Sequence, residues 1–132
     1  MNNYKYYLIS FLSTISIIFN SCADCGYEKV QVIHDLKNYQ SIVGFVRNCG
    51  ATTSESINVM FIKPDMNLGK DKTDIFTAEL SMDLFLKRIS EDTVKIIYCA
   101  SDDRIIRQEK EIYGIHFIYE NNGRYFNQKA RQ

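Results

Sequence analysis

The chain has 132 residues with 16 basic and 16 acidic side chains, and 45% of its residues are hydrophobic. This length supports a single folded domain with one core, and the balanced charge, without a basic run, excludes nucleic acid as a partner. Nine Tyr, eight Phe and many β-branched residues favour strands over helices. The composition therefore predicts a mainly β protein, built as an antiparallel sheet or a small sandwich of about six to eight short strands.

Residues 1–21 have the pattern of a signal peptide. Lys5 is the only charged residue among them, and an apolar run of about 12 residues begins at Leu8, too short for the ~20 that a membrane span needs. The junction Phe19-Asn20-Ser21-Cys22 resembles the bacterial lipobox, in which the cysteine is lipidated and becomes the new N-terminus. This resemblance implies a lipoprotein signal peptide over 1–21 and palmitate-type acyl chains on Cys22, several of which anchor a protein stably in a membrane.

The N-terminus also predicts where the protein resides. We expect a lipid-anchored protein of the bacterial cell envelope, on the periplasmic face of the outer membrane rather than in the inner membrane, because Ala23 and not Asp follows Cys22. An ordinary signal peptide cut near Ala23 is the alternative. Behind the anchor we expect a short tether over residues 22–26, a single β-rich domain over 27–126 and a polar tail over 127–132.

Short runs of β-branched and aromatic residues predict the strands. In chain order they are Tyr27–Ile33, Ser41–Arg47, Ser56–Ile62, Ile75–Leu80, Leu84–Ile89, Val94–Cys99, the short edge strand Arg104–Arg107, Ile112–Tyr119, and Arg124–Phe126 as a candidate return strand after the tight turn Asn121–Gly123. Lys63–Thr73 contains the only proline and alternating charges, which indicates a surface loop.

The stretch 75–89 is ambiguous. Apolar residues recur in it at helical spacing, and Thr73 or Asp74 would cap the N-terminus of such a helix. The recurring residues are Ile75, Ala78, Met82, Phe85 and Ile89. Two short apolar runs followed by the polar turn Ser90–Thr93 favour two strands instead. One helix around 75–89 remains the alternative.

The connector 48–54, between the second and third predicted strands, is small, polar and hydroxyl-rich. Turn chemistry alone explains these residue types, because Gly50 supplies a backbone angle that other residues avoid and short hydroxyls bond to local backbone. The alternative is a partner-binding site formed by this connector and the Lys63–Thr73 loop. The contacts predicted from the connector are Asn48, Thr52, Thr53 and Ser54.

Export into an oxidising compartment favours disulfides. With Cys22 lipidated, Cys25, Cys49 and Cys99 remain, which allows one disulfide and one free thiol. If the first two predicted strands pair as a hairpin about Lys37, Cys25 lies opposite Cys49, so Cys25–Cys49 is the preferred disulfide. Cys49–Cys99 is the alternative. In the preferred arrangement Cys99 is a small buried hydrophobic residue.

The run Phe45–Thr53, followed by a strand, resembles a motif in a family of small, uncharacterised bacterial domains that are often exported or lipid-anchored. The later run Leu86–Tyr98 is similar to that family too, so the resemblance covers most of the chain behind the signal peptide. Its most specific part is the Cys-Gly-Ala-Thr-Thr core, Cys49–Thr53. The resemblance implies a β-rich exported domain and carries no established activity.

The sequence predicts no catalytic residues, metal or cofactor. A thiol-dependent hydrolase would need Cys49 beside a base, and His34 and His116 are the only histidines. A disulfide is the better use of Cys49 in an oxidising compartment. The cysteine spacings match no structural zinc pattern, and the sequence has neither a Gly-rich phosphate loop nor a Gly-x-Ser-x-Gly elbow. Hydrolase activity is therefore the least favoured alternative.

These features favour a membrane-anchored, non-catalytic binding or accessory lipoprotein with a protein partner in the periplasm, such as an immunity-type protein that captures a toxin. Specificity in a small tethered β domain can lie in loops carried by a rigid sheet. A purely structural envelope component is the alternative. In either case the acyl chains make the lipid bilayer a partner.

Overall fold

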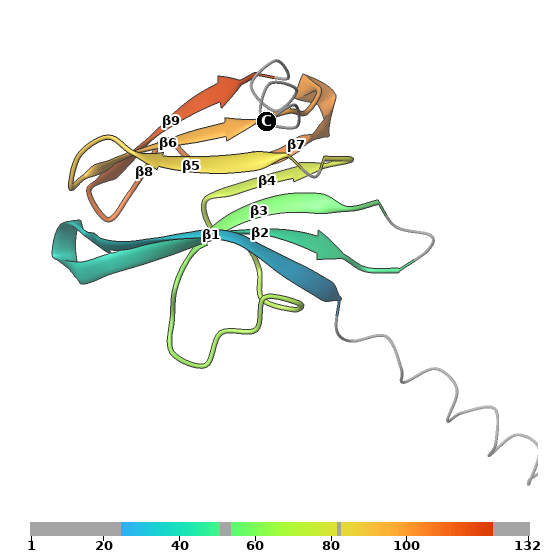
Figure 1. The fold of residues 1–132 in the computed structure, drawn as a ribbon, viewed down its shortest axis with the longest axis horizontal. Coiled ribbons are helices and arrows are strands. Elements are labelled where there is room, and N and C mark those ends of the chain that lie inside the picture. Colours follow the sequence, from blue (N-terminus) through green and yellow to red (C-terminus); the bar gives the residue numbers. More distant parts are fainter. Residues whose placement is uncertain (1–24, 51–53, 82, 123–132) are drawn as a thin grey trace, which may run out of the picture.

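The computed structural model describes residues 25–50, 54–81 and 83–122 (Figure 1). Its strands are β1 (Gly26–Leu36), β2 (Gln40–Asn48), β3 (Ser56–Phe61), β4 (Phe76–Glu79), β5 (Leu84–Arg88), β6 (Thr93–Tyr98), β7 (Ile105–Gln108), β8 (Glu111–Ile112) and β9 (Ile115–Asn121). The only helical segments in the described residues are the short 3-10 turns η2 (Lys37–Tyr39) and η3 (Asp102–Arg104). The prediction of a mainly β fold is therefore confirmed. No helix in this part of the chain is long and apolar enough to cross a membrane.

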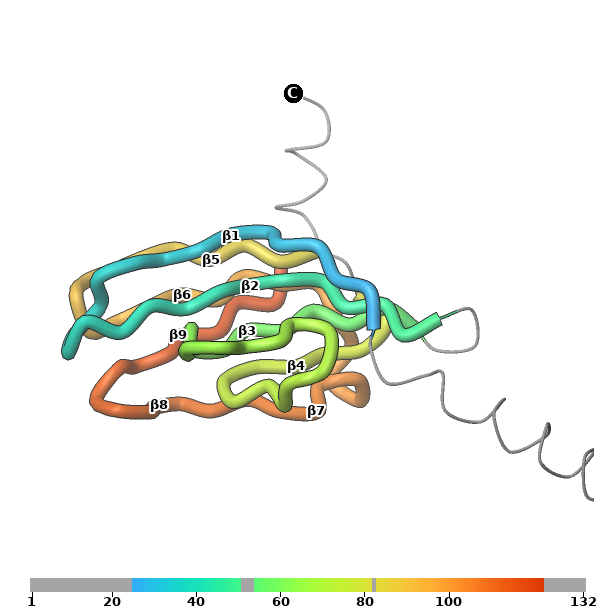
Figure 2. Tube along the Cα trace, turned by 90° about the horizontal axis from the view of Figure 1, so that it is seen from below, coloured from blue at the N-terminus to red at the C-terminus, as the bar shows by residue number. Residues whose placement is uncertain are grey.

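The strands form two sheets that pack face to face (Figures 1 and 2). The five-stranded sheet has the order β1-β2-β3-β4-β7, and all of its pairs are antiparallel. The four-stranded sheet has the order β5-β6-β9-β8, and its β6–β9 pair is parallel. The sandwich is as predicted, whereas the parallel pair is not. It arises because the chain leaves β6, crosses to the other sheet as β7 and returns through β8, a crossover that a parallel pair requires.

The ambiguous stretch 75–89 forms two strands, β4 and β5, in different sheets. In β4, Phe76 and Ala78 are buried while Thr77 and Glu79 are partly exposed, which is the alternation of a strand with one face in the core. The local sequence allows either one helix or two strands. The strands form because β4 pairs with β3 and β7, and β5 pairs with β6.

The predicted single strand over 112–119 is interrupted. Tyr113 and Gly114 have φ angles of 54° and 72°, the left-handed values of a tight hairpin turn, so β8 ends at Ile112 and β9 folds back against it. Tyr113 is consequently exposed, whereas Ile115 and Phe117 point into the core. The predicted return strand over 124–126 and the polar tail lie outside the described residues.

The main core lies between the two sheets and receives alternate residues from nearly every strand. Gly44 of β2 lets the sheets approach closely. A Cβ atom on this residue would lie only 2.9 Å from Leu84 Cδ2 and 3.1 Å from Leu86 Cδ1, both on the opposite sheet. The absence of a side chain at Gly44 is therefore a packing requirement of the sandwich.

Along one side of the sandwich, a single side chain connects the two sheets. The Gln31 amide of β1 donates from Nε2 to Leu86 O (2.7 Å) and accepts at Oε1 from Leu86 N (2.9 Å), so β1 bonds to the backbone of β5. A β-bulge between Lys29 and Gln31 gives Gln31 this direction. The bulge also breaks the alternation of β1, because Val30 is 41% exposed although Val32, two residues later, is partly buried.

Candidate functional site

The outer face of the five-stranded sheet divides into an apolar half and a polar half. In the apolar half, Val43, Phe45 and Met60 form a second small core with Leu68, which comes from the 63–73 loop. The polar half extends from there toward the end of the sheet where β1 begins. The surface loop predicted over Lys63–Thr73 therefore covers one half of this face and borders the other.

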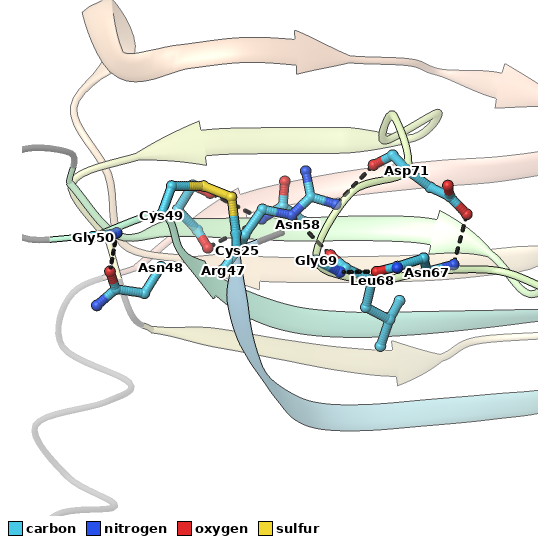
Figure 3. Close-up of a disulfide and its surroundings, with 11 residues drawn as sticks. Cys25, Arg47, Asn48, Cys49, Gly50, Asn58, Asn67, Leu68, Gly69 and Asp71 are labelled. Carbon is cyan, nitrogen blue, oxygen red and sulfur yellow. Dashed lines mark hydrogen bonds between the residues drawn. A yellow bond between two sulfur atoms is a disulfide. The ribbon is translucent and has the colours of Figure 1, made fainter. Parts of the chain in front are cut away.

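The preferred disulfide is confirmed: Cys25 and Cys49 are bonded, at a sequence separation of 24 (Figure 3). The register of β1 and β2, with Gly26 opposite Asn48, places the two cysteines across from each other, as the predicted hairpin requires. Cys99 is free, but it is partly exposed and not buried as expected. It lies just after the last residue of β6, where the chain leaves the core.

The 63–73 loop is held in place by bonds to β1 and β2. Arg47 of β2 donates from Nε to Leu68 O (2.8 Å) and from Nη2 to Asp71 O (2.7 Å), and Cys25 N donates to Gly69 O (3.1 Å) (Figure 3). Asn67 stabilises the loop internally, since its Oδ1 accepts from Gly69 N at 2.9 Å. A Cβ atom on Gly69 would overlap the Cys25 carbonyl oxygen, so only glycine allows this approach.

Between this loop and the connector residues Cys49 and Ser54 lies an open cleft of about 720 Å³, here named the polar cleft. Its floor is the polar half of the sheet face, and it extends across β2, β3 and β4 to β7. The lining residues are Arg47, Cys49, Ser54, Ser56, Asn58, Lys72, Thr73, Thr77, Glu79, Ile106 and Arg107. The connector and the loop, both predicted to contact a partner, thus border one cavity.

Asn58 organises the floor of the polar cleft. Its side chain is almost fully buried, with 1% exposed, although it points away from the main core. Oδ1 accepts from Thr73 Oγ1 (3.0 Å) and Thr77 Oγ1 (3.2 Å), while Nδ2 donates to the Ser56 carbonyl and hydroxyl oxygens (3.1 and 3.0 Å). The amide therefore fixes three hydroxyl-bearing residues from β3, β4 and the loop at the base of the cavity.

The charges around the polar cleft are mainly positive. Arg47, Lys72 and Arg107 line it, and among the described lining residues Glu79 is the only acidic one. Arg107 also pairs with Glu109, at 2.9 Å. Burial lowers the pKa of the Arg47 guanidinium, and the nearby Asp71 partly offsets this effect. A guanidinium nevertheless keeps its proton in proteins, so the cavity presents fixed positive charge beside hydroxyl groups.

The structure describes two of the four predicted contact residues, Asn48 and Ser54. Ser54 lines the polar cleft. Asn48 instead stabilises the connector, since its Oδ1 accepts from Gly50 N (3.0 Å) and its Nδ2 donates to Glu55 Oε1 (3.3 Å). Gly50 has a φ of 117°, so the turn interpretation of this glycine is supported. Thr52, Thr53 and the predicted lipidation site Cys22 lie outside the described residues.

Neither histidine is placed to activate Cys49, whose sulfur is in the disulfide. His34 lies near the β1–β2 turn, the opposite end of that hairpin from the disulfide, and is exposed. His116, at the start of β9, is exposed and pairs with Glu111 (Nδ1 to Oε2, 3.3 Å). Within residues 25–50, 54–81 and 83–122, no group of three or more His, Cys, Asp or Glu side chains is arranged to hold a metal ion.

No protein-family model, curated protein or solved structure matches this chain. The resemblance to a family with the Cys-Gly-Ala-Thr-Thr motif therefore stays a prediction from the sequence. The candidate site rests on the geometry of the polar cleft alone.

We expect Asn58→Ala to lower the free energy of unfolding by about 2 kcal/mol, because Thr73 and Thr77 lose a shared buried acceptor. Chemical denaturation measures this change. Thr77→Val is the matched control: it removes one of the two donors, keeps the side-chain shape and should cost about 1 kcal/mol. An Asn58→Ala protein as stable as the wild type would contradict the assigned role of this amide.

Proposed function

We propose that this protein is a lipid-anchored, non-catalytic binding module of the bacterial cell envelope and that the polar cleft holds its ligand. The observation that carries the proposal is the cleft itself, in which a buried amide orders hydroxyls beneath three basic side chains. Membrane attachment through Cys22 is part of the proposal and rests on the lipobox-like sequence. The disulfide supports an oxidising compartment, because such bonds persist mainly outside the cytoplasm.

The cavity suits a small polar ligand better than a large protein interface. Its volume of about 720 Å³ falls in the range of small-molecule sites. Energetically dominant contacts in protein interfaces are enriched in Tyr, Trp and Arg packed in desolvated pockets. No aromatic side chain is among the described residues that line the polar cleft, and Ile106 is its only large aliphatic one.

Capture of a protein, including immunity-type binding of a toxin, is the second candidate and would use the other end of the molecule. There the β1–β2, β5–β6 and β8–β9 turns lie together: Lys37 N donates to Glu91 O (2.7 Å), and the Lys37 side chain lies over Gly114. Tyr39 is 95% exposed and Tyr113 65% exposed on these turns. Tyrosines on rigid loops are typical anchors of protein recognition.

Photo-crosslinking in living cells tests both candidates. A benzoyl-phenylalanine at Ser54 reports on the polar cleft, and one at Tyr39 reports on the distal turns. We expect a specific adduct at Ser54 and none at Tyr39. A protein adduct at Tyr39 alone would favour the second candidate. The absence of any adduct at Ser54 would remove the proposed ligand site and leave a structural role.

A further inference from the structure

We propose that the polar cleft binds the phosphate headgroup of an anionic phospholipid in the membrane leaflet that holds Cys22. This inference rests on the proposed function, since it requires the lipid anchor. It combines three observations: the cleft lies at the end of the sheet where the chain enters, the tether to the proposed anchor is very short, and three of the four charged residues that line the cavity in the described part of the chain are basic.

The register of the five-stranded sheet places the cleft at the entry end. Gly26, the first residue of β1, lies opposite Asn48, the last residue of β2. In the adjoining strands, Ser56 lies between Arg47 and Glu79. Figure 2 shows the same end, where β1 starts in blue and β2 ends next to the start of β3. The disulfide at this end is itself part of the cleft wall through Cys49.

The tether leaves this end little freedom. Only Ala23 and Asp24 separate Cys22 from Cys25, so three Cα–Cα steps span roughly 11 Å at most. Cys25 is fixed twice, by its disulfide to Cys49 and by its N–H bond to Gly69 O. A lipidated Cys22 therefore holds the entry end of the sheet at the headgroup layer, with the distal turns directed away from the membrane.

The chemistry of the cavity fits a phosphate diester. Arg47, Lys72 and Arg107 outnumber Glu79 among its charged lining residues, and Ser and Thr hydroxyls from the connector, β3 and β4 supply further donors. Glu109 pairs with Arg107, and Asp71, which acts electrostatically on Arg47, accepts from Asn67 N at Oδ2, so these carboxylates offset part of the positive charge.

The test uses the lipidated full-length protein with benzoyl-phenylalanine at Ser54, reconstituted into vesicles of phosphatidylcholine alone or of an equal mixture with phosphatidylglycerol. We expect a phosphatidylglycerol adduct, identified by mass, that is enriched over phosphatidylcholine. The same probe at Tyr39 should give none. Lys72→Gln with Arg107→Gln should lower the adduct yield by about fivefold for each cation removed. The exposed pair Lys87→Gln with Lys110→Gln is the matched control and should leave the yield unchanged.

The outcomes separate the inference from the proposed function. If the protein does not stay with the vesicles, both the proposed lipid anchor and the headgroup inference are wrong. If the protein stays with the vesicles but the probe at Ser54 labels both lipids equally, only the headgroup inference is wrong. The same holds if the Lys72 and Arg107 substitutions leave the adduct yield unchanged. A protein adduct at Ser54 in cells would also overturn the inference while keeping the polar cleft as a binding site.

Discussion

Replacing both Cys25 and Cys49 with serine is expected to lower the free energy of unfolding by about 3 kcal/mol. The bond closes a loop with a sequence separation of 24, and an open loop gives the unfolded chain more conformations. The melting temperature should fall by more than about 10 °C. Guanidinium titration and thermal unfolding of the oxidised wild type and the double variant measure both quantities.

Cys99→Ala is the matched control for this experiment, because it removes a cysteine that forms no disulfide. It should change stability by less than about 1 kcal/mol. Equal stability of the double variant and the wild type would show that the disulfide does not constrain the unfolded chain. The double variant should also lose order at the polar cleft, since Cys49 lines it and Cys25 holds the loop at Gly69.

Phe76→Ala is expected to cost about 4 kcal/mol, the largest effect of any single substitution proposed for this protein. Phe76 of β4 is fully buried between the sheets. The centroid of its ring lies 4.7 Å from the ring centroid of Tyr98 and 5.4 Å from that of Tyr119, and both tyrosines are on the opposite sheet. Removing it leaves a cavity and ends both ring contacts. Equilibrium unfolding in denaturant measures the loss.

Phe76→Leu provides the comparison, because it keeps most of the apolar volume and should cost about 1.5 kcal/mol. Both variants lose the ring contacts, so the difference between their free energies of unfolding reports the cost of the larger cavity. If Ala and Leu were equally costly, cavity formation would not be the main cause. Since small domains are stable by only about 5–15 kcal/mol, the Ala variant should retain only a small margin of stability at 37 °C.

The strands and the disulfide could be predicted because both depend on local patterns. Short runs of β-branched and aromatic residues mark β3 and β6, and the polar turn near Lys37 sets a hairpin register that brings Cys25 opposite Cys49. The break at Tyr113 was missed because the Tyr-Gly pair looks like any other part of an apolar strand. Only the return of β8 onto β9 selects the left-handed backbone there.

The polar cleft could be predicted only in part. Ser54 and the 63–73 loop were candidate contacts, but Asn58, Thr77 and Arg107 were not. Alternation in β3 and β4 could have placed Asn58 and Thr77 on the outer face of a sheet. The sequence does not tell which strands are neighbours, and β7 joins β4 only after the chain has built two strands of the other sheet.

The Gln31 amide also affects how copies of this chain can associate. An unpaired strand edge is a template for association with a neighbouring copy, and the proposed membrane anchor would bring such copies close together. β1 and β5 are the outer strands of their sheets on one side, and Gln31 engages the backbone of Leu86 on β5 through both its donor and its acceptor. Gln31 therefore occupies one donor and one acceptor on the outer edge of β5, at a point where a strand from a neighbouring copy would otherwise pair.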